Sequence, residues 1–528
     1  MGVMISSLRG ASTREDVSLK QPFFRPTLRQ DITEANINEL FESPEFRDVI
    51  AQRLSGAVKI PTQTYDDVGK IGEDDRWDVF YRFSTYLKKT FPRVYRTFDI
   101  ETFNEHAFLY TWKGSDSSLK PLVFMAHSDV VPASDSTADR WTHPPFEGHY
   151  DGTYIWGRGS VDDKSNVIAK LSAFEALILA DFKPTRTVIL ALGCDEEGGS
   201  HGYGAAALAP RLLETYGEDG VEIIMDEGTL GIENRWGTDF AIPATTEKGH
   251  VDVTVTIDGA GGHSSTPPYH TNIGYLAQII QKIEENQFNS RLTSINPTKA
   301  YLETAAHHAK TMDKSLRDAI LAGSTDKVIE YLNRDPSTRA QIRTTTAVDV
   351  IQGGVKSNAL PESASVLINH RIAVEESVQG VLDHYEKILG PLAKKWGFSL
   401  QALNEKNPST TRFYKSSSAK ITITTHGDLE PSPPSDPKDE RFSWLAGTIR
   451  GVFGEDVVVA PVLEVGNTDT RFYWKLCPQI YRINPYSAKW DPRGLKIHTV
   501  DERMPVDGLL ELVKFYHEFI RVVDEKRV

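Results

Sequence analysis

Cysteine is scarce in this sequence. Only Cys194 and Cys477 occur in 528 residues. Two cysteines cannot form a framework of disulfides, so a disulfide-stabilised secreted scaffold is excluded and a reducing compartment is the simpler interpretation. The chain also lacks an Asn-x-Ser/Thr glycosylation site with a permitted middle residue, which argues against a secretory route.

Long apolar runs are missing as well. No stretch approaches the ~18 apolar residues that identify a membrane helix, and the N-terminus "MGVMISSLRGAS" lacks the apolar core of a signal peptide. We therefore expect a cytoplasmic protein with no membrane span. Gly2 and Ser6 fit the short N-myristoylation pattern, which a second methionine at position 4 weakens.

Basic runs are the third absence. Lys and Arg number 59 against 73 Asp and Glu, so the formal net charge is −14. With no long basic run, we expect no nucleic-acid partner, and we interpret the acidity as a contribution to solubility. Hydrophobic residues at 39% and charged residues at 25% are ordinary for a globular protein, and the length allows two to four domains.

Strands and helices alternate in the first half of the chain. A polar arm over residues 1–40 leads into helical patterns at 36–58 and 74–91. Apolar strand patterns follow at 106–114, 121–129, 186–197 and 221–229, with helical patterns at 164–180 and 202–217 between them. This order predicts an α/β domain with a mainly parallel sheet covered by helices.

The pattern changes near Glu247. Residues 248–259 alternate apolar and polar side chains, as in a sheet with one solvated face. Helices at 272–286 and 376–397 and strands at 344–354, 364–373 and 419–427 complete a smaller α+β domain, which carries a helical insertion at about 298–335. The Pro-rich segment 429–437 leads back to α/β character. We expect an arm (1–40), a catalytic domain in two parts (41–246 and 431–528) and an inserted lid domain (247–430).

Ligand-type side chains follow the apolar strands of the first domain. Three strands lead into His127-Ser128-Asp129, Asp195-Glu196-Glu197 and Asp226-Glu227, and the pair Asp162-Asp163 precedes a helix. The carboxyl ends of parallel strands gather at one edge of the sheet, so these groups should converge. Converging carboxylates repel one another unless a cation joins them, and Zn²⁺ accepts both imidazole and carboxylate ligands. The sequence therefore predicts a metal centre.

Other hydrolytic sites fit less well. Gly198–Gly202 matches the G-x-S-x-G elbow of serine hydrolases, and Asp469 and His498 follow in the order of a triad. Ser200, however, lies several polar residues beyond the end of its strand, and no HGGG-type oxyanion motif occurs. The absence of H-E-x-x-H excludes a thermolysin-like zinc site.

Several motifs in order resemble a known enzyme family. "HSDVVPA", "WTHPPFEGHYDGTYIWGRGSVDDK", "GCDEEGGSHG", "DEGT" and "GGHSSTPP" resemble the co-catalytic zinc family of aminoacylase, carnosinase-type dipeptidases and carboxypeptidase S. "GNTDTRFYW", "IYRINP" and "HTVDER" are most similar to its carboxypeptidase S branch, which includes N-fatty-acyl amino acid hydrolases. The resemblance covers about residues 40–525.

The resemblance implies a set of metal ligands. Two zinc ions, replaceable by Co²⁺ or Mn²⁺, would be held by His127, Asp162, Glu197, Asp226 and His498. His127 and Asp226 would bind one ion, Glu197 and His498 the other, and Asp162 would bridge them. In relatives the peptide bond after the bridging aspartate is cis.

The resemblance also implies catalytic and substrate-binding residues. Glu196 would be the general base, Asp129 would orient His127, and His263 on the lid domain would polarise the scissile carbonyl. The substrate carboxylate would be held by Asn358 and Arg371, with support from the backbone of Gly466.

These roles predict a small-molecule amidohydrolase. The expected substrate is a dipeptide or N-acyl amino acid with a free carboxylate, and the reverse, amide-forming direction stays open. A non-catalytic binding module would require a missing ligand or base, and none is missing.

We expect a moving lid with hinges of few packed residues at 246–249 and 431–437. His263 would come from the same chain or from a homodimer partner, whose contact the helical insertion could block. The remaining histidines of the motifs and the insertion are interpreted as structural or solvated: His143, His149, His201, His307 and His308.

Overall fold

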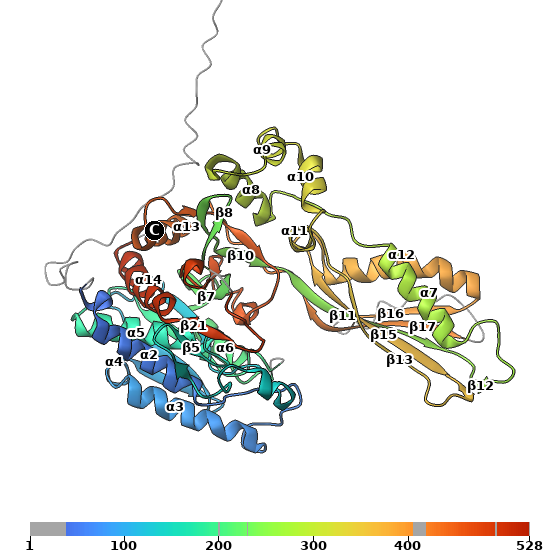
Figure 1. Ribbon diagram of the computed structural model, residues 1–528, viewed down its shortest axis with the longest axis horizontal. Coiled ribbons are helices and arrows are strands. Elements are labelled where there is room, and N and C mark those ends of the chain that lie inside the picture. The colour runs from blue at the N-terminus through green and yellow to red at the C-terminus, as the bar shows by residue number, and fades with distance from the viewer. Residues whose placement is uncertain (1–38, 199–200, 230, 405–418, 492–493, 527–528) are drawn as a thin grey trace, which may run out of the picture.

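The computed structural model describes residues 39–198, 201–229, 231–404, 419–491 and 494–526, and Figure 1 shows a broad lobe from which a narrower one projects. We call the broad lobe, built on an eight-stranded sheet, the large lobe. The projecting five-stranded sheet with its two helices is called the lid. The proposed myristoylation signal and Ser200 lie outside the described residues.

The large sheet confirms the expected fold class. Its central strands run parallel, with antiparallel neighbours on both sides. Its order is β1 (Asp99–Phe103), β2 (Ala107–Trp112), β6 (Val188–Gly193), β3 (Leu122–His127), β7 (Ile223–Thr229), β20 (Ile480–Ile483), β10 (Ala244–Glu247) and β19 (Val462–Glu464).

Both faces of the central strands are buried. Leu122 and Phe124 of β3 face one helical layer, whereas Val123 and Met125 face the other. Strands covered on both faces read as continuous apolar runs, which explains "LVFMA" in β3. The first layer contains α2 (Pro44–Val58), α3 (Asp78–Thr90), α4 (Val94–Thr97), α5 (Lys164–Leu179), α13 (Glu440–Phe453) and α14 (Val506–Glu525), and the second contains α6 (Ala205–Tyr216). Among the described residues, no helix combines the length and apolarity that a bilayer crossing requires.

The lid sheet is amphipathic. Alternate residues of β11 are buried against α7 (Asn272–Glu285) and α12 (Val378–Trp396), which cover one face of the sheet. Figure 1 shows these helices on one side of the projecting sheet. The strand order is β13 (Ala347–Gly353), β15 (Ser363–Ile372), β11 (Gly249–Asp258), β17 (Lys420–Leu429) and β16 (Ser399–Leu403).

The helical insertion packs on the large lobe. In sequence it separates two strands of the lid, yet its apolar side chains share a core with Phe240, Ile242 and Val458 of the large lobe. The insertion therefore covers the base of the lid and leaves the lid's distant end uncovered (Figure 1). Its helices are α8 (Pro297–His308), α9 (Lys314–Leu321), α10 (Thr325–Leu332) and α11 (Pro336–Ala340).

Three small sheets complete the described fold. One joins β8 (Ile232–Arg235), β9 (Thr238–Ala241) and β18 (Val458–Val459). A second joins β4 (His149–Tyr150), β5 (Tyr154–Trp156) and β21 (Arg503–Pro505). The third forms the tip of the lid from β12 (Gly262–His263) and β14 (Ala359–Leu360).

The expectation of a hinge with few packed residues was wrong for the first connection between lid and large lobe, because residues 246–249 are all buried. In the second connection Ser432 and Ser435 are buried, whereas Pro433, Pro434 and Asp436 are exposed. Thr246 and Ser432, one from each connection, are buried. The Thr246 hydroxyl donates to the Ser432 carbonyl at 2.7 Å, and the Glu247 N–H donates to the Ser432 hydroxyl at 2.7 Å. The connections lie side by side because each satisfies the buried polar groups of the other.

A buried ion pair lies at the same place. The Glu247 carboxylate is 3.0 Å from the Arg482 guanidinium, and both side chains are 1% exposed. Thr470 donates its hydroxyl to Glu247 at 2.8 Å and accepts from Arg482 at 2.8 Å. Glu247, Arg482 and Thr470 thus connect the end of β10 to β20, two residues before the first strand of the lid begins.

Removing one partner of this pair should destabilise the protein strongly. Arg482→Met leaves the Glu247 carboxylate buried without its guanidinium, and a buried charge that loses its partner costs about 3–5 kcal/mol. The double variant Glu247→Leu/Arg482→Met, which removes both charges, should lose less than Arg482→Met alone. Urea unfolding measures both free energies. Equal losses in the two variants would show that packing at this site outweighs the charge pair.

Candidate metal centre

His127, at the end of β3, faces two carboxylates. Its Nε2 atom is 3.1 Å from Asp162 Oδ1 and 3.1 Å from Glu227 Oε1. Asp162 lies two residues before the start of α5, and Glu227 lies near the end of β7. Three segments far apart in sequence therefore bring one nitrogen and two oxygens together at the carboxyl edge of the sheet, as the strand order predicts.

Asp162 also contacts a second histidine with its other oxygen. The Nε2 atom of His498 is 3.0 Å from Asp162 Oδ2 and 2.9 Å from Glu197 Oε1. Asp162 thus lies between two clusters, one around His127 and one around His498. Its peptide bond to Asp163 is cis, as the resemblance implied.

The second carboxylate beside His127 is Glu227, whereas the sequence suggested Asp226. Asp226 belongs to no group of converging ligand atoms among the described residues, and its Oδ1 accepts the N–H of Glu227 at 2.9 Å. Both acids line one small cavity with His127, but the pairing of β7 with β20 is irregular just after Asp226, and only Glu227 brings an oxygen within 3.1 Å of the His127 ring. The "DEG" motif alone could not show which one does.

Asp129 holds the first cluster together. Its two carboxylate oxygens accept the backbone N–H groups of Glu196 and Glu197 at 3.2 and 3.0 Å. The same carboxylate lies 3.3 Å from Nδ1 of His127 and accepts the hydroxyl of Thr64 at 2.8 Å. Asp129 is fully buried. It therefore contacts the His127 ring and the backbone of the two adjacent glutamates.

Two further carboxylates position the bridging segment, and the sequence analysis assigned neither a role. Glu502 accepts the backbone N–H groups of Val161 and Asp162 at 3.0 and 3.3 Å and pairs with Arg158 at 2.6 Å. Asp163 accepts the backbone N–H of His127 at 3.2 Å. Their places in "HTVDER" and "VDDK", beside expected ligands, are the only sequence signal for them.

The site concentrates negative charge in a buried place. Burial lowers the pKa of His127, but the charge of Glu227 and hydrogen bonds to neighbouring carboxylates outweigh burial and raise it well above its usual value. Hydrogen bonds to two carboxylates raise the pKa of His498 to about 10. Burial, with neighbouring carboxylates, raises the pKa of Glu196 and of Glu227 well above their usual range. In the protein alone, Glu196, Glu227 and the two imidazoles therefore favour their protonated forms.

This donor set fits divalent metal ions. Around a four-coordinate Zn²⁺ ion with bonds of 2.0–2.1 Å, neighbouring ligand atoms lie about 3.3 Å apart, close to the separations seen here. Two groups of converging ligand atoms share Asp162: His127, Asp162 and Glu227, and Asp162, Glu197 and His498. A third grouping of His127, Glu196 and Glu197 places Glu196 beside the first.

Arg371 and Gly466 approach each other where the lid meets the large lobe. The Arg371 guanidinium donates to Asn467 Oδ1 at 2.8 Å, directly beside Gly466. Among the described residues, Arg371 forms no ion pair with a carboxylate, and burial lowers its pKa. The strand β15 therefore presents a guanidinium without a direct ion pair near the segment that leads to Asp469, a residue lining a small cavity with Glu196.

His263 and Asn358 lie at the opposite end of the lid. Both are exposed, and the Ser264 N–H donates to the Asn358 carbonyl at 3.4 Å. The ten residues of β15 separate Asn358 from the Arg371 end, a span of about 30 Å at the usual rise of a strand. The two residues expected to hold one carboxylate are thus apart within this chain, and Figure 1 shows β12, which carries His263, far from the large sheet.

The serine-hydrolase alternative finds no support in the described residues. The ring of His498 contacts Asp162 and Glu197, and Asp469 is buried with Arg471 as its nearest cation, at 3.9 Å. His498 is therefore engaged with the carboxylate cluster.

Comparisons with known proteins bear on the chain as a whole. The sequence model of Peptidase family M20/M25/M40 matches residues 123–522. Carboxypeptidase S of Saccharomyces cerevisiae is 40% identical over 506 residues, 93% of this chain and 87% of that protein. N-fatty-acyl-amino acid synthase/hydrolase PM20D1 of Homo sapiens is 32% identical over 488 residues, 91% of this chain and 89% of that protein. Human carnosine dipeptidase 1 shares the fold, with a TM-score of 0.61 at 16% identity, over 93% of this chain and 99% of that chain.

Metal analysis of two neighbouring variants should distinguish Glu227 from Asp226. Loss of a residue that merely supports a ligand typically weakens metal binding 10–100-fold, so Glu227→Gln should weaken it by at least about tenfold. Asp226→Asn should have a smaller effect. Equilibrium dialysis against buffered zinc gives both affinities. The reverse ranking would restore Asp226 as the ligand.

Proposed function

The chain belongs to peptidase family M20/M25/M40, and from that premise we propose that it cleaves the amide bond of a dipeptide or N-acyl amino acid with a free carboxylate. The observation that carries the proposal is the placement of Asp162, whose two oxygens face His127 and His498 separately. This arrangement supports two metal ions that share one carboxylate. The proposed ligands are His127, Asp162 and Glu227 for one ion and Asp162, Glu197 and His498 for the other.

Zinc is the proposed metal, because two imidazoles and three carboxylates form a borderline set of donors that it accepts readily. When bound, a pair of such ions lowers the pKa of a water molecule and polarises the substrate carbonyl. In this chain Asp129 and Glu502 would fix the backbone of the ligand residues. A carboxylate that is not a ligand, that of Glu196, would transfer the proton.

Glu196 is the proposed general base. Its carboxylate lies within 4.8 Å of ligand atoms of His127 and Glu197, yet it makes no short contact with either histidine among the described residues. The Asp129 carboxylate accepts the backbone N–H of Glu196, which fixes the position from which the Glu196 side chain extends. Glu196 would take a proton from the attacking water and deliver it to the nitrogen of the leaving amine.

Arg371 is proposed to hold the carboxylate of the substrate. A guanidinium binds a carboxylate with two parallel hydrogen bonds, and in the described part of the chain this one donates to the Asn467 amide and makes no direct ion pair. The backbone of Gly466 would also contact the substrate carboxylate. The names of the two relatives, a carboxypeptidase and an N-fatty-acyl-amino acid synthase/hydrolase, suit a substrate with a free carboxylate. The second name supports amide formation as a second candidate activity of the same site.

A second copy of the chain is proposed to supply His263 and Asn358. Both residues lie together at the lid's tip, away from the metal ligands of their own chain. The lid also exposes apolar side chains toward solvent: Val350 is 46% exposed, Ile351 59% and Val355 101%. Exposed apolar groups on a sheet edge are typical of an association surface. The helical insertion packs elsewhere, so it does not cover this edge.

Replacing the proposed base should separate catalysis from metal binding. Glu196→Gln should keep its metal content and lose kcat by a factor of about 10²–10⁴, the usual contribution of a general base. Glu197→Gln should instead lose metal. Plasma mass spectrometry gives the metal content, and release of an amino acid from N-acyl amino acids and dipeptides gives the rate. Full activity after chelation and proven removal of metal would refute the proposed function.

Mixing two inactive variants tests whether the site is shared between chains. His263→Ala and Glu196→Gln chains should each be inactive alone. If the partner supplies His263, their mixture should recover up to about a quarter of wild-type activity, because some dimers contain one intact site. No recovery, despite subunit exchange shown by mass spectrometry, would mean that each chain closes its own lid on its own site.

A further inference from the structure

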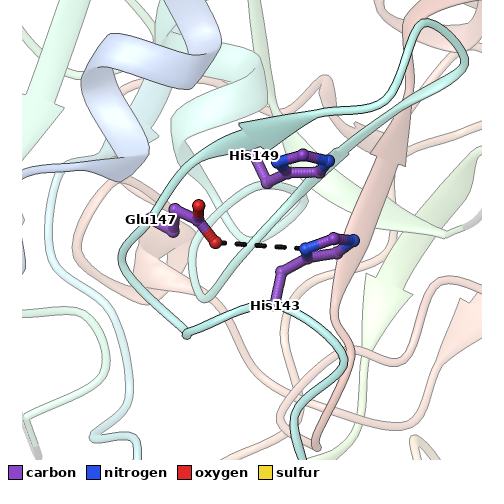
Figure 2. Close-up of side chains that lie close together, drawn as sticks. All are labelled: His143, Glu147 and His149. Carbon is purple, nitrogen blue, oxygen red and sulfur yellow. Dashed lines mark ion pairs between the residues drawn. The ribbon is translucent and has the colours of Figure 1, made fainter.

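We infer that His143, Glu147 and His149 form an additional metal site, outside the centre around Asp162. One candidate ligand atom from each of the three lies within 4.8 Å of the other two. Figure 2 shows the Glu147 carboxylate pointing toward His143, with the two imidazole rings facing each other. Two imidazole nitrogens and one carboxylate oxygen are a donor set that binds Zn²⁺ and leaves one position for water.

The local sequence brings the two histidines together. Pro144 and Pro145 fix the backbone after His143, and the N–H of Glu147 donates to the carbonyl of Pro144 at 2.9 Å, which closes a tight turn. His149 then begins β4 and pairs with Trp156 of β5. The turn reverses the chain, so side chains six residues apart meet on one surface.

This backbone is held on two further sides. The Ser55 hydroxyl of α2 donates to the Gly148 carbonyl at 2.6 Å, and the Arg158 N–H donates to the Pro145 carbonyl at 2.8 Å. Gly148 has a φ of 58°, and an added Cβ would lie 2.3 Å from the Ser55 carbonyl oxygen. Only glycine fits between the ligands Glu147 and His149. A ligand loop held in this way loses little conformational freedom when an ion binds.

Side-chain movement would complete the site. The rings of His143 and His149 stack with centroids 3.8 Å apart and planes 14° apart, and ring nitrogens bind metals in the plane of the ring. One ring must therefore turn. The Nδ1 atom of His143 lies 3.9 Å from the Glu147 carboxylate, and its ring packs edge-on against Trp156 with 5.3 Å between centroids. His149, which is partly exposed, is the ring expected to rotate.

The site adjoins the segment that carries His498. Thr142, next to His143, donates its N–H and its hydroxyl to the two oxygens of Asp501 at 2.7 and 2.9 Å. Asp501 follows His498 by three residues. An ion bound to His143 would tie this segment to the β4–β5 hairpin, so the inferred role of the ion is structural. The interpretation of His143 and His149 as merely structural or solvated residues is revised accordingly.

Zinc titration of the full chain with its other metals already bound tests the inference. Wild type should bind one more equivalent of Zn²⁺ than His149→Gln or His143→Asn, and each substitution should weaken this binding by at least about tenfold. Glu147→Gln, on a side chain 47% exposed, tests the same site with little risk to folding. His307→Gln, an exposed histidine on α8, is the matched control and should bind as wild type does.

Two outcomes would overturn the inference. Isothermal titration calorimetry could detect no additional equivalent in wild type, or the additional equivalent could persist unchanged in the His143, Glu147 and His149 variants. Circular dichroism confirms that each variant is folded. Because the readout is zinc stoichiometry at residues outside the proposed catalytic centre, its failure leaves the proposed hydrolase function intact, and hydrolysis assays on the same variants show whether that function stands.

Discussion

Repulsion among buried carboxylates is the constraint on which this structure depends. Asp162, Asp163, Glu196, Glu197 and Glu227 gather at one edge of the large sheet, where burial disfavours their charged forms. Two histidines lie within hydrogen-bonding distance of these carboxylates. Backbone N–H groups donate to the neighbouring carboxylates of Asp129 and Glu502, and the strands fix the positions of the side chains. The same constraint explains why a cation is the natural occupant.

A second concentration of buried polar groups lies where the lid begins. Glu247, Arg482 and Thr470 satisfy one another, and Thr246 and Ser432 join the two connections. The carboxylate edge and this junction are adjacent along the large sheet, since Asp226 and Arg482 are paired across β7 and β20. The orientation of the lid and the position of the acidic cluster therefore rest on the same strands.

The sequence predicted what depends on periodicity and chain order. Continuous apolar runs predicted the central strands, alternation predicted β11, and motif order predicted the meeting of His127, Asp162, Glu197 and His498. It assigned Asp226 as a ligand, whereas the carboxylate that lies 3.1 Å from His127 belongs to Glu227, because the local course of the backbone at the end of β7 decides which of two adjacent acids comes nearest. It also missed the packed lid junction, whose hydrogen bonds join residues nearly two hundred positions apart, and the pairing of His143 with His149, which depends on one turn.

The length of the lid determines how far its tip would move if the lid rotated about its junction with the large lobe. The ten-residue strand β11 extends from the junction to the neighbourhood of β12, about 33 Å at the usual rise of a strand. A rotation of about 10° at the junction would move the tip by about 6 Å, more than the length of a side-chain hydrogen bond, while the junction itself shifts very little. In such a rotation the displacement of His263 would grow with the length of β11, so a small change of angle where Thr246 and Ser432 meet would correspond to a large change at the tip of the lid.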